Sequence, residues 1–128
     1  MAKNYMLIYS EQLATDIELL CQNIKAPSNT LFQIRKSSSS VYANIREANY
    51  GQSKADMLSK FEIALKECSE TEGWLQLLSN TNGINDDTYK KHRNSRTFRK
   101  IYKGKRTFLY LCCASRCTCH SVAVDCLN

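Results

Sequence analysis

Residues Gln33 to Leu78 read QIRKSSSSVYANIREANYGQSKADMLSKFEIALKECSETEGWLQLL, and this stretch decides the fold. It predicts two long amphipathic helices, over about 29–49 and 54–78, joined by one tight turn. Apolar and small side chains recur three and four residues apart on both sides of the turn, which is the spacing of one buried helical face. The two faces comprise Leu31, Ile34, Ser38, Val41, Ile45 and Ala48, then Leu58, Phe61, Leu65, Cys68, Glu72 and Leu75.

Four consecutive serines, Ser37 to Ser40, lie inside the first of these helices. Such a run is also typical of a flexible low-complexity linker. The three- and four-residue spacing of apolar side chains continues through the run without a shift. We therefore interpret the serines as a surface that a neighbouring helix approaches closely. Because serine has poor helix propensity, tertiary packing has to hold this segment.

The turn between the two helices carries its own signals. Gly51 suits the left-handed residue that ends a helix, and Ser53 followed by Asp56 resembles a capping box with Asp in place of Glu. Gly73 is unfavourable inside the second helix by about 1 kcal/mol relative to Ala. Trp74 beside it is expected to anchor the core or an interface, and Glu72, which falls on the apolar face, is expected to face an interface.

Two further helices are predicted on either side of this pair. One runs from about Asn4 to Ile24 and ends before Pro27, after which Ser28 is a candidate N-cap. The other begins at Asn85 to Asp87. Past Arg93 its apolar spacing weakens to one short stripe, Phe98, Ile101 and Tyr102, which Gly104 interrupts. Four helices with short connections predict an all-α, antiparallel up-down four-helix bundle. Its fourth helix is expected to be truncated or replaced by an irregular basic, Cys-rich tail.

Length and charge divide the chain unevenly. Its 128 residues fit one helical bundle domain over 1–94 followed by a basic, Cys-rich segment over 95–128. Met1 to Tyr89 holds 8 Lys/Arg and 11 Asp/Glu, a net −3, whereas the rest holds 10 Lys/Arg and only Asp125, a net +9. A basic block of this kind is typical of a polyanion-binding arm. The alternative is a solvated tail that binds nothing.

Nucleic-acid binding is the activity that this charge pattern favours. Basic side chains meet phosphates, and the interleaved Phe98, Tyr102 and Phe108 offer faces for stacking on unpaired bases. No segment resembles a base-reading helix, so binding should tolerate any sequence. The predicted contact residues are Arg35, Lys36, Arg46, Lys90, Lys91, Arg93, Arg96, Arg99, Lys100, Lys103, Lys105 and Arg106. The alternative function is a protein–protein interaction scaffold with no nucleic-acid role.

The cysteines and histidines do not form a recognisable reactive or metal site. Cys21 and Cys68 fall on apolar helical faces, as buried cysteines normally do. Cys112, Cys113, Cys117, Cys119 and Cys126 crowd the last seventeen residues, but they lack the two separated pairs that zinc prefers. We therefore predict no enzyme, no metal and no cofactor.

The apolar runs do not predict export or membrane insertion. Met6 to Tyr9 is too short for the core of a signal peptide. The uncharged run from Thr107 to Ser115 is far below the roughly 20 residues of a membrane span. The expected location is the cytoplasm.

The stretch from Gln33 to Leu78 closely resembles the four-helix-bundle family of 23S rRNA-intervening-sequence proteins, or S23 family. The matching residues are Gln33-Ile34-Arg35, Ser40-Val41, Asn44-Ile45-Arg46-Glu47-Ala48, Tyr50-Gly51, Ser53, Phe61, Ala64-Leu65, Ser69-Glu70-Thr71-Glu72 and Trp74 to Leu78. The resemblance implies a homo-oligomer, with a five-fold ring suspected, and no enzymatic activity. Related accessory proteins of diversity-generating retroelements further imply RNA or DNA and a reverse transcriptase, or another protein, as partners.

Two features depart from the family. Gly73 stands where relatives tend to carry a larger residue. The end of the chain, SRTFRKIYKGKRTFLYLCCASRCTCHSVAVDCLN, replaces the acidic, Leu/Ile-rich run with which relatives usually continue their fourth helix. The abrupt change suggests a replaced or frame-shifted terminus, a hypothesis that resequencing the coding DNA tests.

Overall fold

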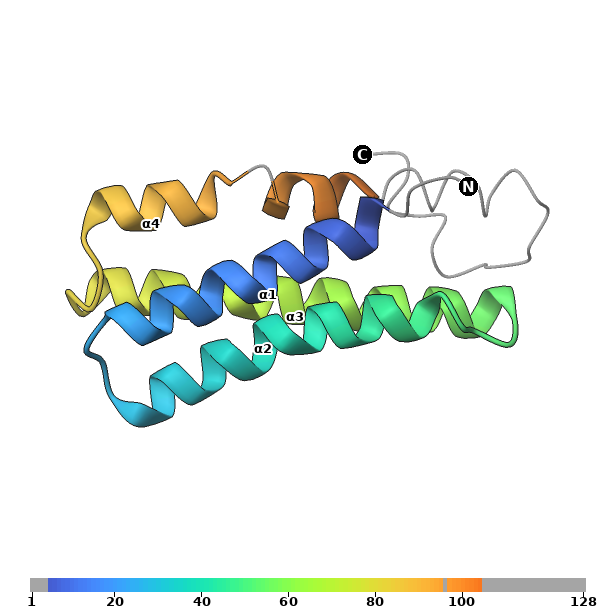
Figure 1. Cartoon of the computed structure of the whole chain (residues 1–128), viewed down its shortest axis with the longest axis horizontal. Coiled ribbons are helices and arrows are strands. Elements are labelled where there is room, and N and C mark those ends of the chain that lie inside the picture. Colours follow the sequence, from blue (N-terminus) through green and yellow to red (C-terminus); the bar gives the residue numbers. More distant parts are fainter. Residues whose placement is uncertain (1–4, 96, 105–128) are drawn as a thin grey trace.

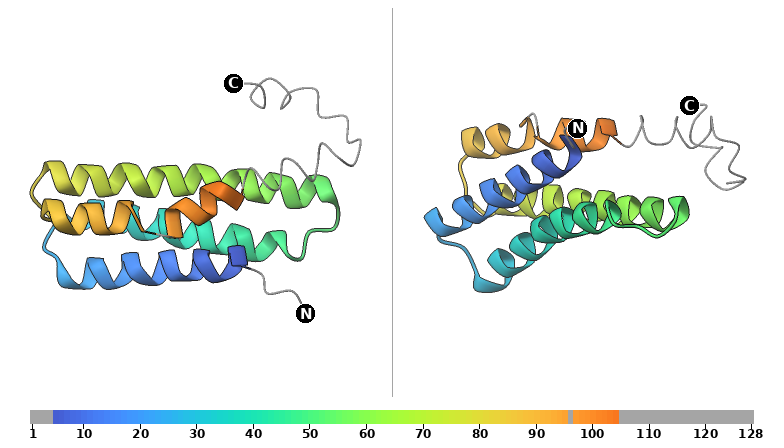
Figure 2. Two further views of the ribbon diagram at one scale, coloured as in Figure 1. Left: turned by 90° about the horizontal axis from the view of Figure 1, so that it is seen from above. Right: turned by 45° about the vertical axis from the view of Figure 1, so that its right-hand side comes forward.

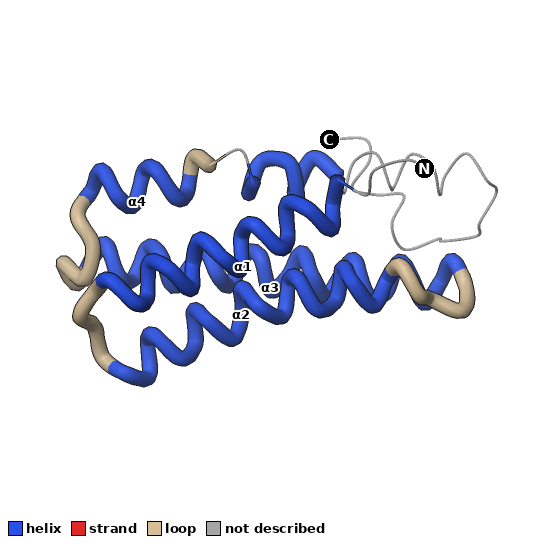
Figure 3. The backbone as a smooth tube through the Cα atoms, in the orientation of Figure 1, coloured by secondary structure: helices blue, strands red, loops and turns tan. Residues whose placement is uncertain are grey.

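The computed structural model describes residues 5–95 and 97–104, and within them helices joined by short connections are present and no strand is. The helices are α1 (Tyr5–Asn23), α2 (Ser28–Ala48), α3 (Lys54–Asn80) and α4 (Asp86–Arg93), and residues 97–104 form a further helical segment. Successive helices run in opposite directions (Figures 1 and 3). The predicted all-α, up-down bundle is confirmed.

The helices surround one core. α2 packs against both α1 and α3, and α4 packs against α3. Figures 1 and 2 show α4 and segment 97–104 on the side of the bundle away from α2, with α1 and α3 between them. The buried apolar side chains are Leu13, Ile17, Leu20, Cys21, Ile34, Val41, Ile45, Ala64, Cys68, Leu75, Leu78, Ile84, Phe98 and Ile101.

The serine run is a packing surface, as predicted. Ser37 and Ser38 are buried against the neighbouring helices. The Thr71 hydroxyl on α3 donates a hydrogen bond to Ser37 Oγ over 2.9 Å, and Ser37 Oγ lies 3.1 Å from the Ile34 carbonyl within α2. Small side chains let α2 and α3 approach closely, and the bonds satisfy the hydroxyls that this approach buries.

Two predicted helix ends are wrong. Pro27, not Ser28, is the N-cap of α2, and no side chain caps that end. No described glycine has a positive φ; the left-handed residue is Asn82, with φ 58°, in the connection from α3 to α4. A Cβ on Gly51 would lie 3.2 Å from Met57 Cβ, so Gly51 serves a close approach of two chain segments and not a left-handed turn.

The predicted cap of α3 is present, and α4 starts where predicted, with a side-chain cap of its own. Ser53 Oγ accepts from the Asp56 amide over 3.1 Å, and the Asp56 carboxylate accepts from the Gln52 amide, one residue earlier than in a regular capping box. Asn85 Oδ1 accepts from the Thr88 amide over 2.7 Å at the start of α4. Each cap satisfies an amide that has no partner inside the helix.

Candidate nucleic-acid interface

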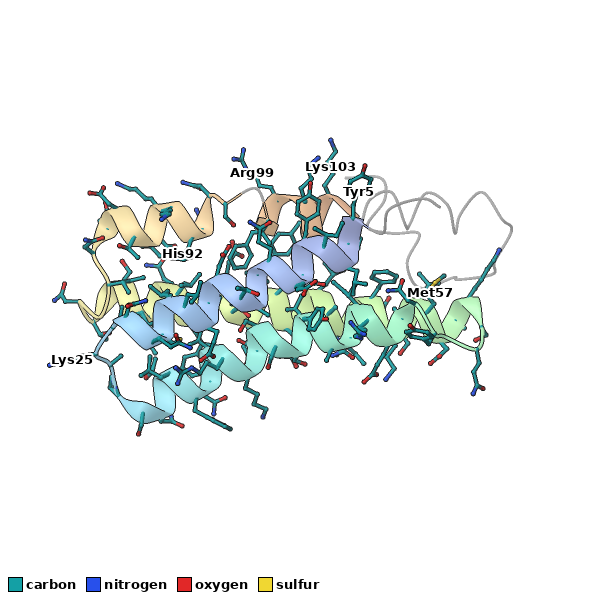
Figure 4. All side chains as sticks on the ribbon, viewed as in Figure 1. Tyr5, Lys25, Met57, His92, Arg99 and Lys103 are labelled. Atoms are coloured by element: carbon teal, nitrogen blue, oxygen red, sulfur yellow. The ribbon has the colours of Figure 1, made fainter. Side chains whose placement is uncertain are left out.

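Six exposed cations follow one edge of the bundle on α4 and segment 97–104, and we call them the basic band. They are Lys90, Lys91, Arg93, Arg99, Lys100 and Lys103. The chain contains no Asp or Glu from residue 88 to residue 104. Figure 4 shows Arg99 and Lys103 pointing outward from this edge. The structure thus brings together the predicted contact residues of this region that it describes.

Segment 97–104 holds its part of the band in place because its opposite face is anchored in the core. Phe98 and Ile101 are buried among the core side chains, which confirms the short apolar stripe predicted there. Tyr102 packs beside them, and its hydroxyl donates to Glu72 Oε2 on α3 over 3.0 Å. Glu72 also lies 3.9 Å from Arg93 Nε on α4. One carboxylate therefore contacts both α4 and segment 97–104.

Most of the band's charge has no carboxylate partner in the part of the chain that the structure describes. Lys90 pairs with Asp86 one turn earlier, and the hydrogen bond and charge of Asp86 raise the pKa of Lys90. Arg93 faces Glu72 at the longer distance given above. Arg99 Nη2 donates only to the Asn94 carbonyl, over 3.1 Å. Among the described residues, no ion pair involves Lys91, Arg99, Lys100 or Lys103.

The described aromatic residues of this region pack against the bundle, one of them buried and two of them partly buried. Phe98 is 2% exposed, so the prediction that it stacks on bases is wrong. Tyr102 is half-buried against Glu72, and burial is the main reason that the pKa of its hydroxyl is raised. The Tyr89 hydroxyl donates to Gln76 on α3. Phe108, the third predicted stacking residue, lies outside the described residues.

The three predicted contact residues of α2 lie away from the band. Arg35 Nε is 3.0 Å from Glu18 Oε2 on α1, and Arg46 Nη1 donates to the Tyr42 hydroxyl over 2.8 Å. Lys36 is exposed on the same helix. Because α2 lies across the bundle from α4 (Figure 2), these residues and the band form separate surfaces.

One exposed aromatic side chain that sequence reasoning missed lies beside the band. Tyr5 at the start of α1 is 62% exposed. Segment 97–104 ends against this part of α1, where a Cβ on Gly104 would meet Met6 Sδ, and Figure 4 shows Tyr5 near Lys103. The available signal was an aromatic residue off the apolar stripe of the first helix.

The two described cysteines lie inside the bundle. Cys21 and Cys68 are buried, as predicted, and burial raises the pKa of the Cys68 thiol to about 12. In the part of the chain that the structure covers, no three His, Cys, Asp or Glu residues gather as metal ligands. No helix in that part is long and apolar enough to span a membrane.

Several predictions fall on residues that the structure does not describe. These are Arg96, Lys105 and Arg106 of the predicted contact set and Cys112, Cys113, Cys117, Cys119 and Cys126 of the Cys-rich tail.

Comparisons with known proteins agree on a family. The model of the 23S rRNA-intervening sequence protein family matches residues 6–102. A solved structure of a protein of unknown function from the S23 ribosomal protein family of Bacteroides thetaiotaomicron is 36% identical, with a TM-score of 0.67. The match covers 77% of this chain and 92% of that one. A comparison with curated proteins finds no relative.

Proposed function

The chain belongs to the 23S rRNA-intervening sequence protein family, and from that premise we propose that it is a non-enzymatic accessory protein. It binds RNA or DNA through the basic band, without sequence preference. The observation that supports this proposal is that four exposed cations of α4 and segment 97–104 have no carboxylate partner among the described residues, namely Lys91, Arg99, Lys100 and Lys103.

The physical basis of the binding is counterion release. Each phosphate that a lysine or arginine neutralises frees condensed cations from the nucleic acid, so affinity falls with salt by a slope of about −0.9 per contact on a duplex. Four contacts predict a slope of about −3.6. Contacts to phosphates position a protein but carry no sequence information. The binding should therefore be salt-sensitive and nearly independent of sequence.

The test compares two variants with the same loss of charge. The band variant carries Lys91→Gln, Lys100→Gln and Lys103→Gln; the control carries Lys25→Gln, Lys54→Gln and Lys66→Gln, which are exposed elsewhere on the bundle and do not belong to the predicted contact set. Fluorescence anisotropy with labelled oligonucleotides is measured across a salt series. The band variant should lose about one unit of slope per lysine, whereas the control should keep the native slope. Equal weakening of both variants, or no salt-dependent binding by the native protein, refutes the proposal.

A second candidate function is a homo-oligomeric interaction scaffold, favoured by a groove between α1 and α2. The groove has a volume of about 360 Å³ and is lined by Ala14, Thr15, Glu18, Leu19, Arg35, Ser38 and Ser39. Leu19 is 52% exposed, and Phe32 on α2 is 61% exposed. The occupant we propose is a second copy of this chain. Glu18 and Arg35 present one negative and one positive charge side by side, so the Glu18 of one copy can pair with the Arg35 of the other.

Light scattering tests the scaffold. The native protein should form an oligomer at micromolar concentration, and Leu19→Lys with Phe32→Lys should lower its molar mass. Tyr50→Lys, at an exposed aromatic residue in the connection between α2 and α3, is the control and should leave the mass unchanged. A native monomer at micromolar concentration refutes this candidate without affecting the nucleic-acid proposal.

A further inference from the structure

We infer that the basic band binds the phosphate backbone of a duplex in preference to a single strand. The inference rests on the nucleic-acid binding proposed above and names the class of its ligand. It follows from the direction in which the aromatic side chains of the band's two helical segments point.

Surfaces that bind single strands combine a positively charged groove with exposed aromatic rings, on which successive bases stack. The described part of residues 89–104 contains three aromatic residues, and all three contact the bundle. Phe98 is buried in the core. The hydroxyls of Tyr102 and Tyr89 are both bound to side chains of α3, namely Glu72 and Gln76. Among the described residues, the cations therefore have no row of exposed rings between them on which bases could stack.

Exposed rings elsewhere do not provide such a row. Phe32 belongs to α2, which lies across the bundle from α4, and Tyr50 belongs to the connection between α2 and α3, at the opposite end of the bundle from α4 (Figure 1). Tyr5 is the one exposed aromatic side chain of the described residues beside the band, and it lies at one end, where segment 97–104 meets α1 (Figure 4). A single ring accommodates one base and cannot form a track for a strand.

The cations themselves suit a duplex. Three of the four without a carboxylate partner are lysines, whose compact charge on a flexible stem needs no fixed geometry. A duplex presents one phosphate charge per about 1.7 Å of its axis, so lysines along a helical edge meet phosphates in any register. Each phosphate contact also releases more counterions from a duplex than from a single strand. The number of cations released per contact is about 0.9 for a duplex and about 0.7 for a single strand.

These values give a measurable difference. Four contacts predict salt slopes of about −3.6 for a duplex and about −2.8 for a single strand. If charge alone drives binding and the two affinities converge near 1 M salt, the difference in slope makes the duplex about tenfold tighter at 50 mM.

Fluorescence anisotropy with a 20-base-pair duplex and one of its strands, chosen to be unstructured, tests the inference on the full chain. We expect about tenfold tighter duplex binding at 50 mM salt, lost in the Lys91→Gln, Lys100→Gln, Lys103→Gln variant. Tyr5→Leu, with Tyr50→Leu as its matched control, should change neither affinity.

Two results overturn the inference while leaving the proposed function in place. One is single-strand binding that equals or exceeds duplex binding and depends on the band lysines. The other is a loss of single-strand affinity in Tyr5→Leu that Tyr50→Leu does not share. Absence of salt-dependent binding to both oligonucleotides refutes the proposed function itself, so the two failures are distinguishable.

Discussion

Replacing Tyr102 with Phe removes the hydroxyl that links segment 97–104 to α3. Its hydrogen bond to Glu72 spans 3.0 Å, and a bond to a charged group contributes about 1.5–3 kcal/mol to stability. Because Tyr102 is only half-buried, we take the lower end and expect Tyr102→Phe to lower the free energy of unfolding by about 1.5 kcal/mol. The Arg93–Glu72 pair is 54% and 30% exposed, so solvent screens it to at most about 1 kcal/mol.

A double-mutant cycle with Glu72→Ala isolates the bond. Urea unfolding is followed by the fluorescence of Trp74, the single tryptophan, which is partly buried against the core. The coupling free energy between the two substitutions should be about 1–1.5 kcal/mol. Tyr50→Phe, at an aromatic residue 80% exposed, is the control and should change stability by less than about 0.5 kcal/mol. A coupling below that value, or equal effects of the two Tyr→Phe substitutions, refutes the idea that Glu72 holds the basic band in place.

Three further predictions concern single sites. Gly73→Ala should raise the free energy of unfolding by about 1 kcal/mol, since a Cβ there meets no atom within 4 Å; an unchanged urea midpoint contradicts this. Gly51→Ala and Gly51→Asn should both destabilise by about 1–3 kcal/mol because any Cβ crowds Met57, whereas a left-handed Gly51 would tolerate Asn better than Ala in the same assay. Burial lowers the pKa of His92 below its ordinary 6.5, so the unfolded chain takes up the proton first. Stability should therefore fall as the pH drops below about 6.5 and level off below the folded pKa, and urea midpoints of His92→Gln should show a shallower fall.

The bundle was predictable because the apolar rhythm is redundant. The three long helices, α1, α2 and α3, each repeat apolar side chains along one face over several turns, so four serines did not obscure the pattern of α2. The spacing of apolar residues did not indicate which side chain would bind those serines. The hydrogen bond between Ser37 and Thr71 joins residues 34 positions apart, and only the assembled helices bring them together.

Helix ends were predicted less well because they depend on local geometry that several residues can supply. At Ser53 the prediction was right, because its hydroxyl accepts from the Asp56 amide. At Ser28 it was wrong, because α2 already begins at that residue after Pro27. Gly51 shows the same ambiguity, since a glycine that permits a left-handed φ and one that permits close packing look identical in a sequence.

The candidate interface shows which part of a binding site a sequence specifies. Charge was predictable by counting, and the band contains most of the basic residues that the count indicated. Glu72, an acidic residue on an apolar stripe, marked the contact that positions the band. Arg35, Lys36 and Arg46 were grouped with the band only because they are basic, and α2 lies on the other side of the bundle.

Alternating aromatic and basic residues can indicate either rings that stack on bases or rings that anchor a helix in the core. The spacing of the residues along the helix distinguishes these two interpretations. In segment 97–104, Phe98, Ile101 and Tyr102 lie three and four residues apart, and so share one face. Arg99, Lys100 and Lys103 fall between them and occupy the other. A ring that anchors a short helix in the core cannot also stack on a base, because one face of the helix is buried and the other is in water. The spacing that keeps the cations on the surface therefore also turns the aromatic rings of this segment toward the core, so the described part of the proposed interface offers positive charge for phosphates and no row of rings for bases.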